Sequence, residues 1–103
     1  MDNSRIDVND IIRTLTEYKD KLAEFSVKNI GLFGSFVRGE QNEHSDIDFL
    51  VEFEEPTLEN YMRLSEFLEN LFNRKIEILT PAGIESIRIK HIKEEIKRSV
   101  MYV

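Results

Sequence analysis

The chain of 103 residues contains no cysteine and no tryptophan, and it has only two prolines and two histidines. Without cysteine it can form neither a disulfide nor a thiolate metal site. The two histidines, His44 and His91, do not make a zinc-binding pattern. No apolar run approaches the roughly 20 residues that span a membrane, and the polar first residues lack the apolar core of a signal peptide. We therefore expect a cytoplasmic protein with no membrane partner.

Positive charge is also scarce. The chain has 14 basic and 20 acidic residues, which gives a net charge of −6. Because tight non-specific binding to nucleic acid needs clustered Lys and Arg, no strong nucleic-acid binding is expected. The hydrophobic fraction of 41% is ordinary for a globular protein, and the length suits one domain. We therefore expect residues 1–103 to form a single domain.

The spacing of apolar residues predicts alternating helices and strands. A helix is expected from about residue 8 to about residue 25, with Asp7 or Asn9 as its N-cap. Thr57 and Thr80 are expected to cap two later helices, the second of which could be interrupted by Gly83 and should end near residue 98. The other expected elements are strands over 27–33, 46–53 and 75–79, a helical turn over 36–39, a helix over 58–72, and an edge strand or docked tail over 100–103. This alternation is typical of the α/β class.

A Gly-Ser pair directly follows the first expected strand. Glycine lets the backbone come close to phosphate oxygens, and the N–H groups and hydroxyl at the start of a short helix can bind them. Arg38 lies one turn further on and can form a forked contact with a phosphate. Gly34, Ser35 and Arg38 are therefore candidates for phosphate binding. The chain has no Gly-x-x-x-x-Gly-Lys sequence, which excludes a Walker-type site.

Two aspartates open the second expected strand. Asp46 and Asp48 are two residues apart, so in a strand both carboxylates project from the same face. Two close carboxylates resist joint ionisation, and a cation between them removes that cost. Mg²⁺ usually takes one or two carboxylates together with substrate phosphates. Glu77 lies on the polar side of the third strand and can converge on the pair if the two strands are neighbours. Three such carboxylates can hold two divalent ions, which makes them candidate metal ligands and catalytic residues.

Each of these features also has a simpler interpretation. An isolated Asp-x-Asp is most often a solvated pair, and an isolated Gly-Ser is a turn. Glu77 could be a solvent-facing strand residue, and Arg38 could pair with Glu40 or Glu43. The strand–turn–loop–strand context favours a site over these alternatives.

The arrangement of these residues resembles a known signature. Gly34-Ser35, the spacer 36–45 and Asp46-x-Asp48 resemble the motif of the DNA polymerase beta-like nucleotidyltransferase superfamily. The small size and the segment Arg-Lys-Ile-Glu-Ile-Leu-Thr-Pro over 74–81 resemble, more narrowly, the minimal nucleotidyltransferases of the MNT antitoxin type. The resemblance covers about residues 27–100. It implies a small mixed β-sheet flanked by helices in the order αβαβαβα, binding of ATP with Mg²⁺ or Mn²⁺, and transfer of a nucleotidyl group.

The resemblance also implies roles for individual residues. It assigns Asp46 and Asp48 to the metal-ligand pair and Gly34 and Ser35 to the triphosphate-binding turn. Glu77 falls where the family usually has a third Asp. Many members are encoded with a helical HEPN ribonuclease toxin and attach AMP to one of its tyrosines. The resemblance therefore implies an antitoxin with a HEPN-type protein partner, in a homo- or hetero-oligomer.

Two functional hypotheses remain open at this point. The intact Gly34-Ser35 and Asp46-x-Asp48 motifs favour an Mg²⁺-dependent protein adenylyltransferase. Glu77 in place of Asp favours an antitoxin that neutralises its partner by binding alone. Nucleotidyl transfer to RNA is disfavoured by the acidic charge, and transfer to a small molecule by the absence of a second domain that could hold the acceptor.

Overall fold

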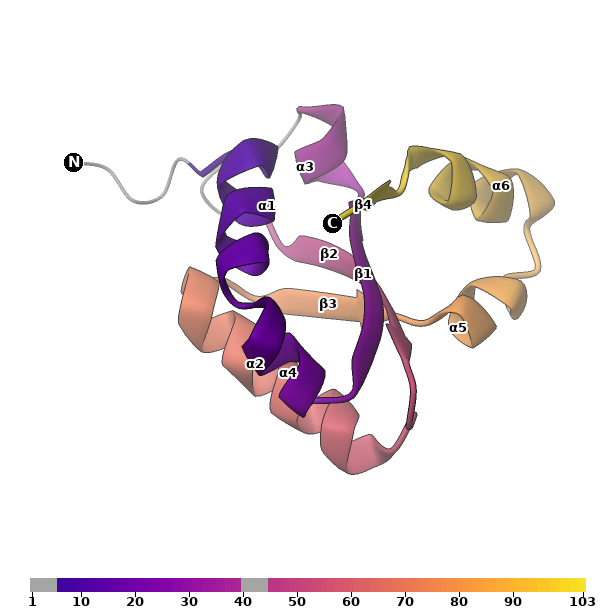
Figure 1. The fold of residues 1–103 in the computed structure, drawn as a ribbon. Helices are drawn as coiled ribbons and strands as arrows, with labels where there is room; N and C mark the ends of the chain where they lie inside the picture. The colour runs from indigo at the N-terminus through magenta and orange to yellow at the C-terminus, as the bar shows by residue number, and fades with distance from the viewer. Residues whose placement is uncertain (1–5, 40–44) are drawn as a thin grey trace.

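The computed structural model describes residues 6–39 and 45–103, with the backbone alone at Ser35 and Arg38. It contains a four-stranded sheet with helices packed around it (Figure 1). The elements are α1 (Val8–Glu17), α2 (Lys19–Glu24), β1 (Val27–Phe33), α3 (Ser35–Arg38), β2 (Ile47–Phe53), α4 (Leu58–Phe72), β3 (Ile76–Leu79), α5 (Pro81–Glu85), α6 (Lys90–Ser99) and β4 (Met101–Tyr102). The expected α/β class, a small mixed sheet flanked by helices, is confirmed. No helix in this part of the chain is long and apolar enough to cross a membrane.

The sheet has the strand order β3-β2-β1-β4. β1 pairs antiparallel with both β2 and β4, whereas β2 and β3 are parallel. Parallel neighbours need a crossover connection, and α4 provides it between β2 and β3. The C-terminal residues, expected as an edge strand or a docked tail, form the edge strand β4.

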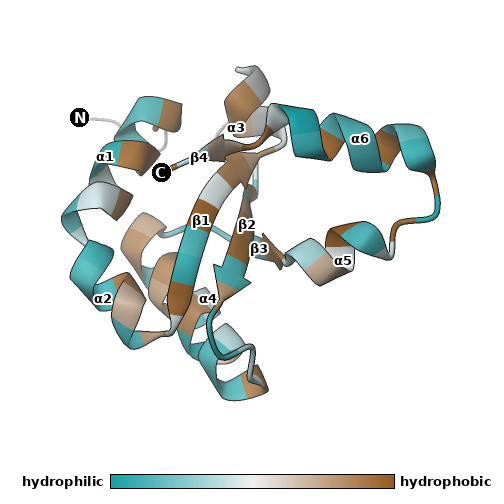
Figure 2. Cartoon of the chain, turned by 45° about the vertical axis from the view of Figure 1, so that its right-hand side comes forward, coloured by the Kyte–Doolittle hydropathy of each residue, from teal (hydrophilic) through white to brown (hydrophobic). Residues whose placement is uncertain are grey.

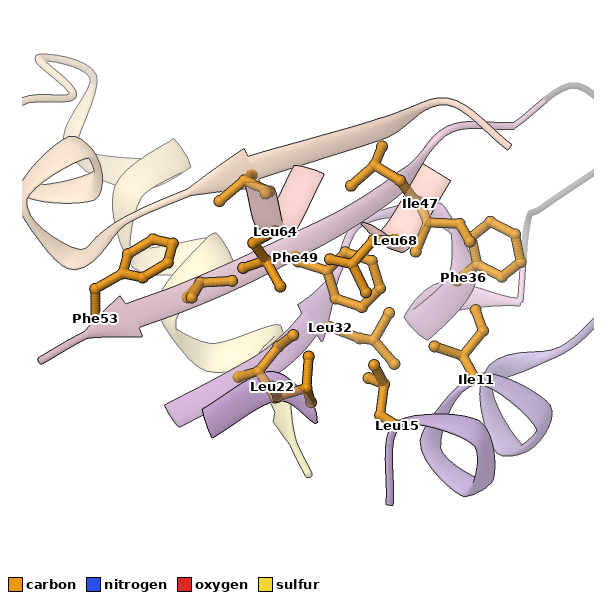
Figure 3. Close-up of a cluster of buried hydrophobic side chains, with 14 residues drawn as sticks. Ile11, Leu15, Leu22, Leu32, Phe36, Ile47, Phe49, Phe53, Leu64 and Leu68 are labelled. Atoms are coloured by element: carbon orange, nitrogen blue, oxygen red, sulfur yellow. The ribbon is translucent and has the colours of Figure 1, made fainter. Parts of the chain in front are cut away.

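The main core lies on one face of this sheet. Hydrophobic residues occupy most of β1 and β2, while α6 is mostly hydrophilic (Figure 2). Residues at alternating positions of the strands point to the same face, and on the core face they meet α1, α2 and α4. Figure 3 shows the side chains that converge there, among them Ile11, Leu15, Leu32, Phe36, Ile47, Phe49, Leu64 and Leu68, all at most 1% exposed. Burying one such side chain stabilises the fold by about 1.5–3 kcal/mol.

Side-chain caps begin three of the helices at the predicted residues. The Asp7 carboxylate accepts a bond from the Asp10 N–H at 2.9 Å, and the Asp10 carboxylate accepts one from the Asp7 N–H at 3.0 Å. Thr57 and Thr80 each accept a bond from the backbone N–H three residues further on, at 3.1 Å. These bonds satisfy N–H groups that have no partner within the helix.

The structure corrects two helix predictions. The first helix is interrupted at Tyr18, whose N–H bonds to the carbonyls of both Thr14 and Leu15 at 3.2 Å, so α1 ends there and α2 begins. The last helical segment is interrupted over 86–89, not at Gly83, which lies inside α5. The Ser86 hydroxyl donates to the Gly83 carbonyl at 2.7 Å, a local bond that competes with helix continuation.

Candidate active site

The acidic residues of β2 and β3 lie on the sheet face opposite the core. Asp48 is the register partner of Phe33 on β1 and of Glu77 on β3. Neighbouring strands lie about 4.8 Å apart, and parallel register partners point to the same face. The second and third strands are therefore neighbours, which is the condition under which Glu77 could approach Asp48. Asp48 is half-buried and Glu77 is exposed, while Asp46 directly precedes β2 and is half-buried.

Gly34 brings the turn after β1 against this acidic face. Its φ of +82° lies in the left-handed region, which side chains disfavour. A methyl group at this position would lie only 2.3 Å from Oδ2 of Asp48. The turn can therefore approach the carboxylate this closely only because residue 34 has no side chain. The structure thus places two candidate residues from separate segments, Gly34 and Asp48, directly beside each other.

The other two candidate phosphate ligands are on α3. The backbone of Ser35 begins this short helix and that of Arg38 ends it, but both side chains lie outside the described part of the structure. Between them, Phe36 is 1% exposed and inserts into the core. This buried ring anchors α3 and so fixes the position of the turn at Gly34.

Arg74 connects the two halves of the site. Its Nη1 donates to the Ser45 carbonyl at 2.9 Å, and its guanidinium carbon lies 5.3 Å from the centre of the Phe36 ring. A guanidinium over an aromatic ring at this distance is attractive. Arg74 therefore holds α3 and the entry to β2 together just before Asp46. The sequence pattern did not predict this contact, although the place of Arg74 before a strand parallel to β2 could have revealed it.

The carboxylates can be tested against the predicted metal. Within residues 6–39 and 45–103, no group of three or more carboxylate or imidazole side chains could hold a metal ion by itself. Asp46, Asp48 and Glu77 therefore do not form a closed metal cage. Mg²⁺, however, is usually bound by one or two carboxylates and completes its shell with phosphate oxygens and water. An Asp48–Glu77 register pair beside the turn at Gly34 fits an ion that arrives with a nucleotide.

Comparisons with known proteins identify the family. Residues 13–103 match the family described as the nucleotidyltransferase domain. The chain is 40% identical over 98 residues to the protein adenylyltransferase MntA of Thermococcus cleftensis, a match that covers 93% of this chain and 95% of the relative.

Solved structures agree with this match. The chain resembles a candidate minimal nucleotidyltransferase with a TM-score of 0.73 and 28% identity, over 95% of this chain and 97% of the other. It shares its fold with the structure of a toxin-antitoxin, MntA-HpeT, with a TM-score of 0.59 and 20% identity, over 96% of this chain and 72% of the other. The chain therefore belongs to the nucleotidyltransferase domain family of enzymes, as its Gly-Ser and Asp-x-Asp motifs predicted.

Proposed function

We propose that residues 1–103 act as one domain that transfers AMP from ATP to a hydroxyl group of a partner protein, and so serve as the antitoxin of a HEPN-type toxin. The observation that carries this proposal is the contact between the turn at Gly34 and the Asp48 carboxylate, with Glu77 in register beside it. The name of the Thermococcus relative supports the adenylyl group and a protein acceptor. The toxin-antitoxin neighbour supports a toxin as partner.

Each candidate residue has a role in this reaction. Asp46 and Asp48 would hold Mg²⁺, or Mn²⁺ in its place, with Glu77 as a further oxygen ligand. The backbone N–H groups at Gly34 and Ser35, the Ser35 hydroxyl and Arg38 bind the triphosphate. When bound there, the ion would neutralise charge on the phosphates and lower the pKa of the attacking hydroxyl. The acceptor oxygen bonds to the α-phosphorus, the bond from that phosphorus to the β-phosphate oxygen breaks, and pyrophosphate leaves. Glu77 orients the acceptor hydroxyl or takes its proton.

A second candidate function is an antitoxin that neutralises its partner by binding alone. Two observations favour it. Glu77 is exposed on the sheet surface, and the described side chains form no group of three that could hold a metal by themselves. If the site binds no metal-nucleotide complex, this second function is the better account.

A melting experiment separates the two functions. A ligand that binds only the folded state stabilises it, by about 2.7 kcal/mol at 100 times its dissociation constant. We expect ATP with Mg²⁺ to raise the melting temperature of the wild type more than ATP with EDTA does. In Asp48→Asn this Mg²⁺-dependent increment should disappear.

Glu52→Gln is the matched control for this experiment. Glu52 lies on β2 and on the same face as Asp48, and its carboxylate accepts a bond from Asn29 at 2.9 Å, which a glutamine can also accept. This variant should retain the full Mg²⁺-dependent increment. An undiminished increment in Asp48→Asn would place the metal elsewhere and remove the basis of the enzymatic proposal.

A further inference from the structure

A hollow lies on the same sheet face as the candidate active site. It is an open cavity of about 230 Å³ between the sheet, α5 and the C-terminal end of the chain. Typical sites for drug-sized ligands measure about 300–1,000 Å³, so this cavity suits a single ring system better than a whole nucleotide. It is lined by Leu50, Pro81, Ile84, Glu85, Lys97 and Tyr102.

The floor of the cavity depends on a glycine of β1. Gly31 is the register partner of Leu50 on β2 and of Tyr102 on β4. A methyl group at Gly31 would lie 2.7 Å from Cγ1 of Val100 and 3.1 Å from Cδ1 of Tyr102. Because β1 carries no side chain here, the Tyr102 ring lies directly on the backbone. Tyr102 is nevertheless 62% exposed, so much of its side chain remains free to contact a ligand.

The opposite wall is formed by α5 and is tied to α6. Ile84 is 2% exposed and Leu50 is 5% exposed, so the cavity is closed on these sides by tightly packed apolar side chains. The Glu85 carboxylate pairs with Lys93 at 2.7 Å and also with Lys97, which connects α5 to α6. The charges at the rim of the cavity are therefore paired with one another, and the interior is apolar.

The cavity lies close to the candidate phosphate and metal site. Leu50 follows Asp48 by two residues on β2 and points to the same face. At this spacing the two side chains are about 7 Å apart along the strand. Gly34 touches Asp48 from the other direction. The phosphate-binding turn, the carboxylate and the apolar cavity thus follow one another across a single face of the sheet.

We propose that this cavity binds the heteroaromatic base of the nucleoside triphosphate, with the Tyr102 ring stacked on the base and Leu50 and Ile84 against its edges. The inference rests on the proposed function, because that function places the phosphates at Gly34 and Asp48. A ribose then bridges the separation between the carboxylates and the cavity. An apolar cavity with one aromatic wall favours a flat ring, since every base has a face that can stack on an aromatic side chain.

The test compares ATP with inorganic tripolyphosphate, which has the phosphates but no base. Dissociation constants of both, each with Mg²⁺, are measured by calorimetry for the wild type, Tyr102→Ala and Tyr102→Phe. We expect Tyr102→Ala to weaken ATP binding about 10-fold, the usual size of a lost base–aromatic stack, and to leave tripolyphosphate binding unchanged. Tyr102→Phe keeps the ring and should bind ATP like the wild type.

Met101→Ala is the matched control. The experiment also distinguishes failure of the base site from failure of the proposed function. Met101 is the neighbour of Tyr102 on β4, is 42% exposed and points to the other face of the sheet. Its replacement should change neither constant. Wild-type affinity for ATP in Tyr102→Ala, or equal loss of ATP and tripolyphosphate binding, would overturn the base site while leaving the proposed function intact. If the wild type binds neither ligand, the proposed function itself fails and the base site falls with it.

Discussion

At the scale of single residues, the candidate active site depends on a position without a side chain. Gly34 has a φ of +82° and would clash with Asp48 if it carried a methyl group. Gly39, at the other end of α3, has a φ of +72°, but among the described residues no atom beyond its chain neighbours lies within 4 Å of the place where a methyl group would be. Both glycines therefore adopt the left-handed backbone conformation, but only at Gly34 would an added side chain clash with Asp48.

This difference yields a paired prediction. Gly34→Ala and Gly39→Ala should each lose about 1–2 kcal/mol of folding stability, the usual cost of the left-handed conformation for alanine. Only Gly34→Ala should also displace the Asp48 carboxylate and weaken the binding of ATP with Mg²⁺. Urea unfolding gives the stabilities, and calorimetry gives the affinities. Equal ATP affinities of the two variants would show that the contact between residues 34 and 48 is not needed for binding.

The sequence predicted part of this arrangement. Strand alternation placed Asp48 and Glu77 on polar faces, and the parallel register of β2 and β3 confirms that they are neighbours. The close approach of Gly34 to Asp48 and the bridge made by Arg74 were not predicted, because both join segments that are far apart in the sequence. The roles of Ser35 and Arg38 stay predictions, since the structure does not describe their side chains.

At the scale of elements, strands were easier to predict than helix ends. The predicted bounds of β1 agree with the structure, because a turn precedes it and Gly34 follows it. Gly31, inside β1, allows Val100 and Tyr102 to approach the backbone closely. No proline or glycine marks the helix break at Tyr18 in the sequence. The break coincides with a tertiary contact, in which the Tyr18 ring packs edge-on against Phe67 of α4 with the ring centres 5.7 Å apart.

The link between α5 and α6 has a measurable pH dependence. Hydrogen bonds from Lys93 and then Lys97 lower the pKa of Glu85 from 4.5 to about 2. Because the pKa is lower in the folded state, this link stabilises the fold fully above pH 4.5, and the contribution is lost as the pH falls from 4.5 towards 2. The wild type should therefore have a higher melting temperature than Glu85→Gln at pH 7. This difference in melting temperature should become smaller as the pH falls to 3.

Solvent limits how strongly the pairs of Glu85 with Lys93 and Lys97 stabilise the fold. The Glu85 side chain is 56% exposed, so water and salt weaken the pairs and the difference should shrink in high salt. Glu94→Gln is the control, since Glu94 pairs only loosely with Lys90, at 4.0 Å within the same helix. Thermal melts of the three proteins at several pH values make the measurement. If the difference in melting temperature between the wild type and Glu85→Gln is the same at every pH, Glu85 stabilises the fold by packing and not by charge.

At the scale of the whole molecule, the two faces of the sheet have different roles: one packs into the core that stabilises the fold, and the other carries the candidate active site. One face meets α1, α2 and α4 in the main core, and the other carries Asp48, Glu77 and the cavity at Leu50. The sequence agrees with this division, because Ile47, Phe49, Val51 and Phe53 alternate with Asp48, Leu50 and Glu52. It did not predict the cavity, which requires β4 to return to β1 across the length of the chain.

The division predicts that two leucines of α4 differ sharply. Leu64 is fully buried and Leu58 is 74% exposed, although both lie on the same helix. Leu64→Ala should cost about 2–5 kcal/mol through lost burial and a residual cavity. Leu58→Ala should stay within about 0.5 kcal/mol of the wild type. Urea unfolding measures the free energy of unfolding of the wild type and both variants. Similar losses of this free energy in the two variants would contradict the assignment of the core.

The most direct test of the central claim is label transfer to the protein encoded by the neighbouring gene. Wild type and Glu77 variants are incubated with that protein, Mg²⁺ and ATP labelled on the α-phosphate or the γ-phosphate, and mass spectrometry locates the modified residue. The account predicts transfer of the α-label only. Glu77→Gln should be slower by about two orders of magnitude, as expected for loss of a general base, and Glu77→Asp should keep at least part of the rate. Neutralisation of the partner without any label, or an unchanged rate in Glu77→Gln, would contradict it.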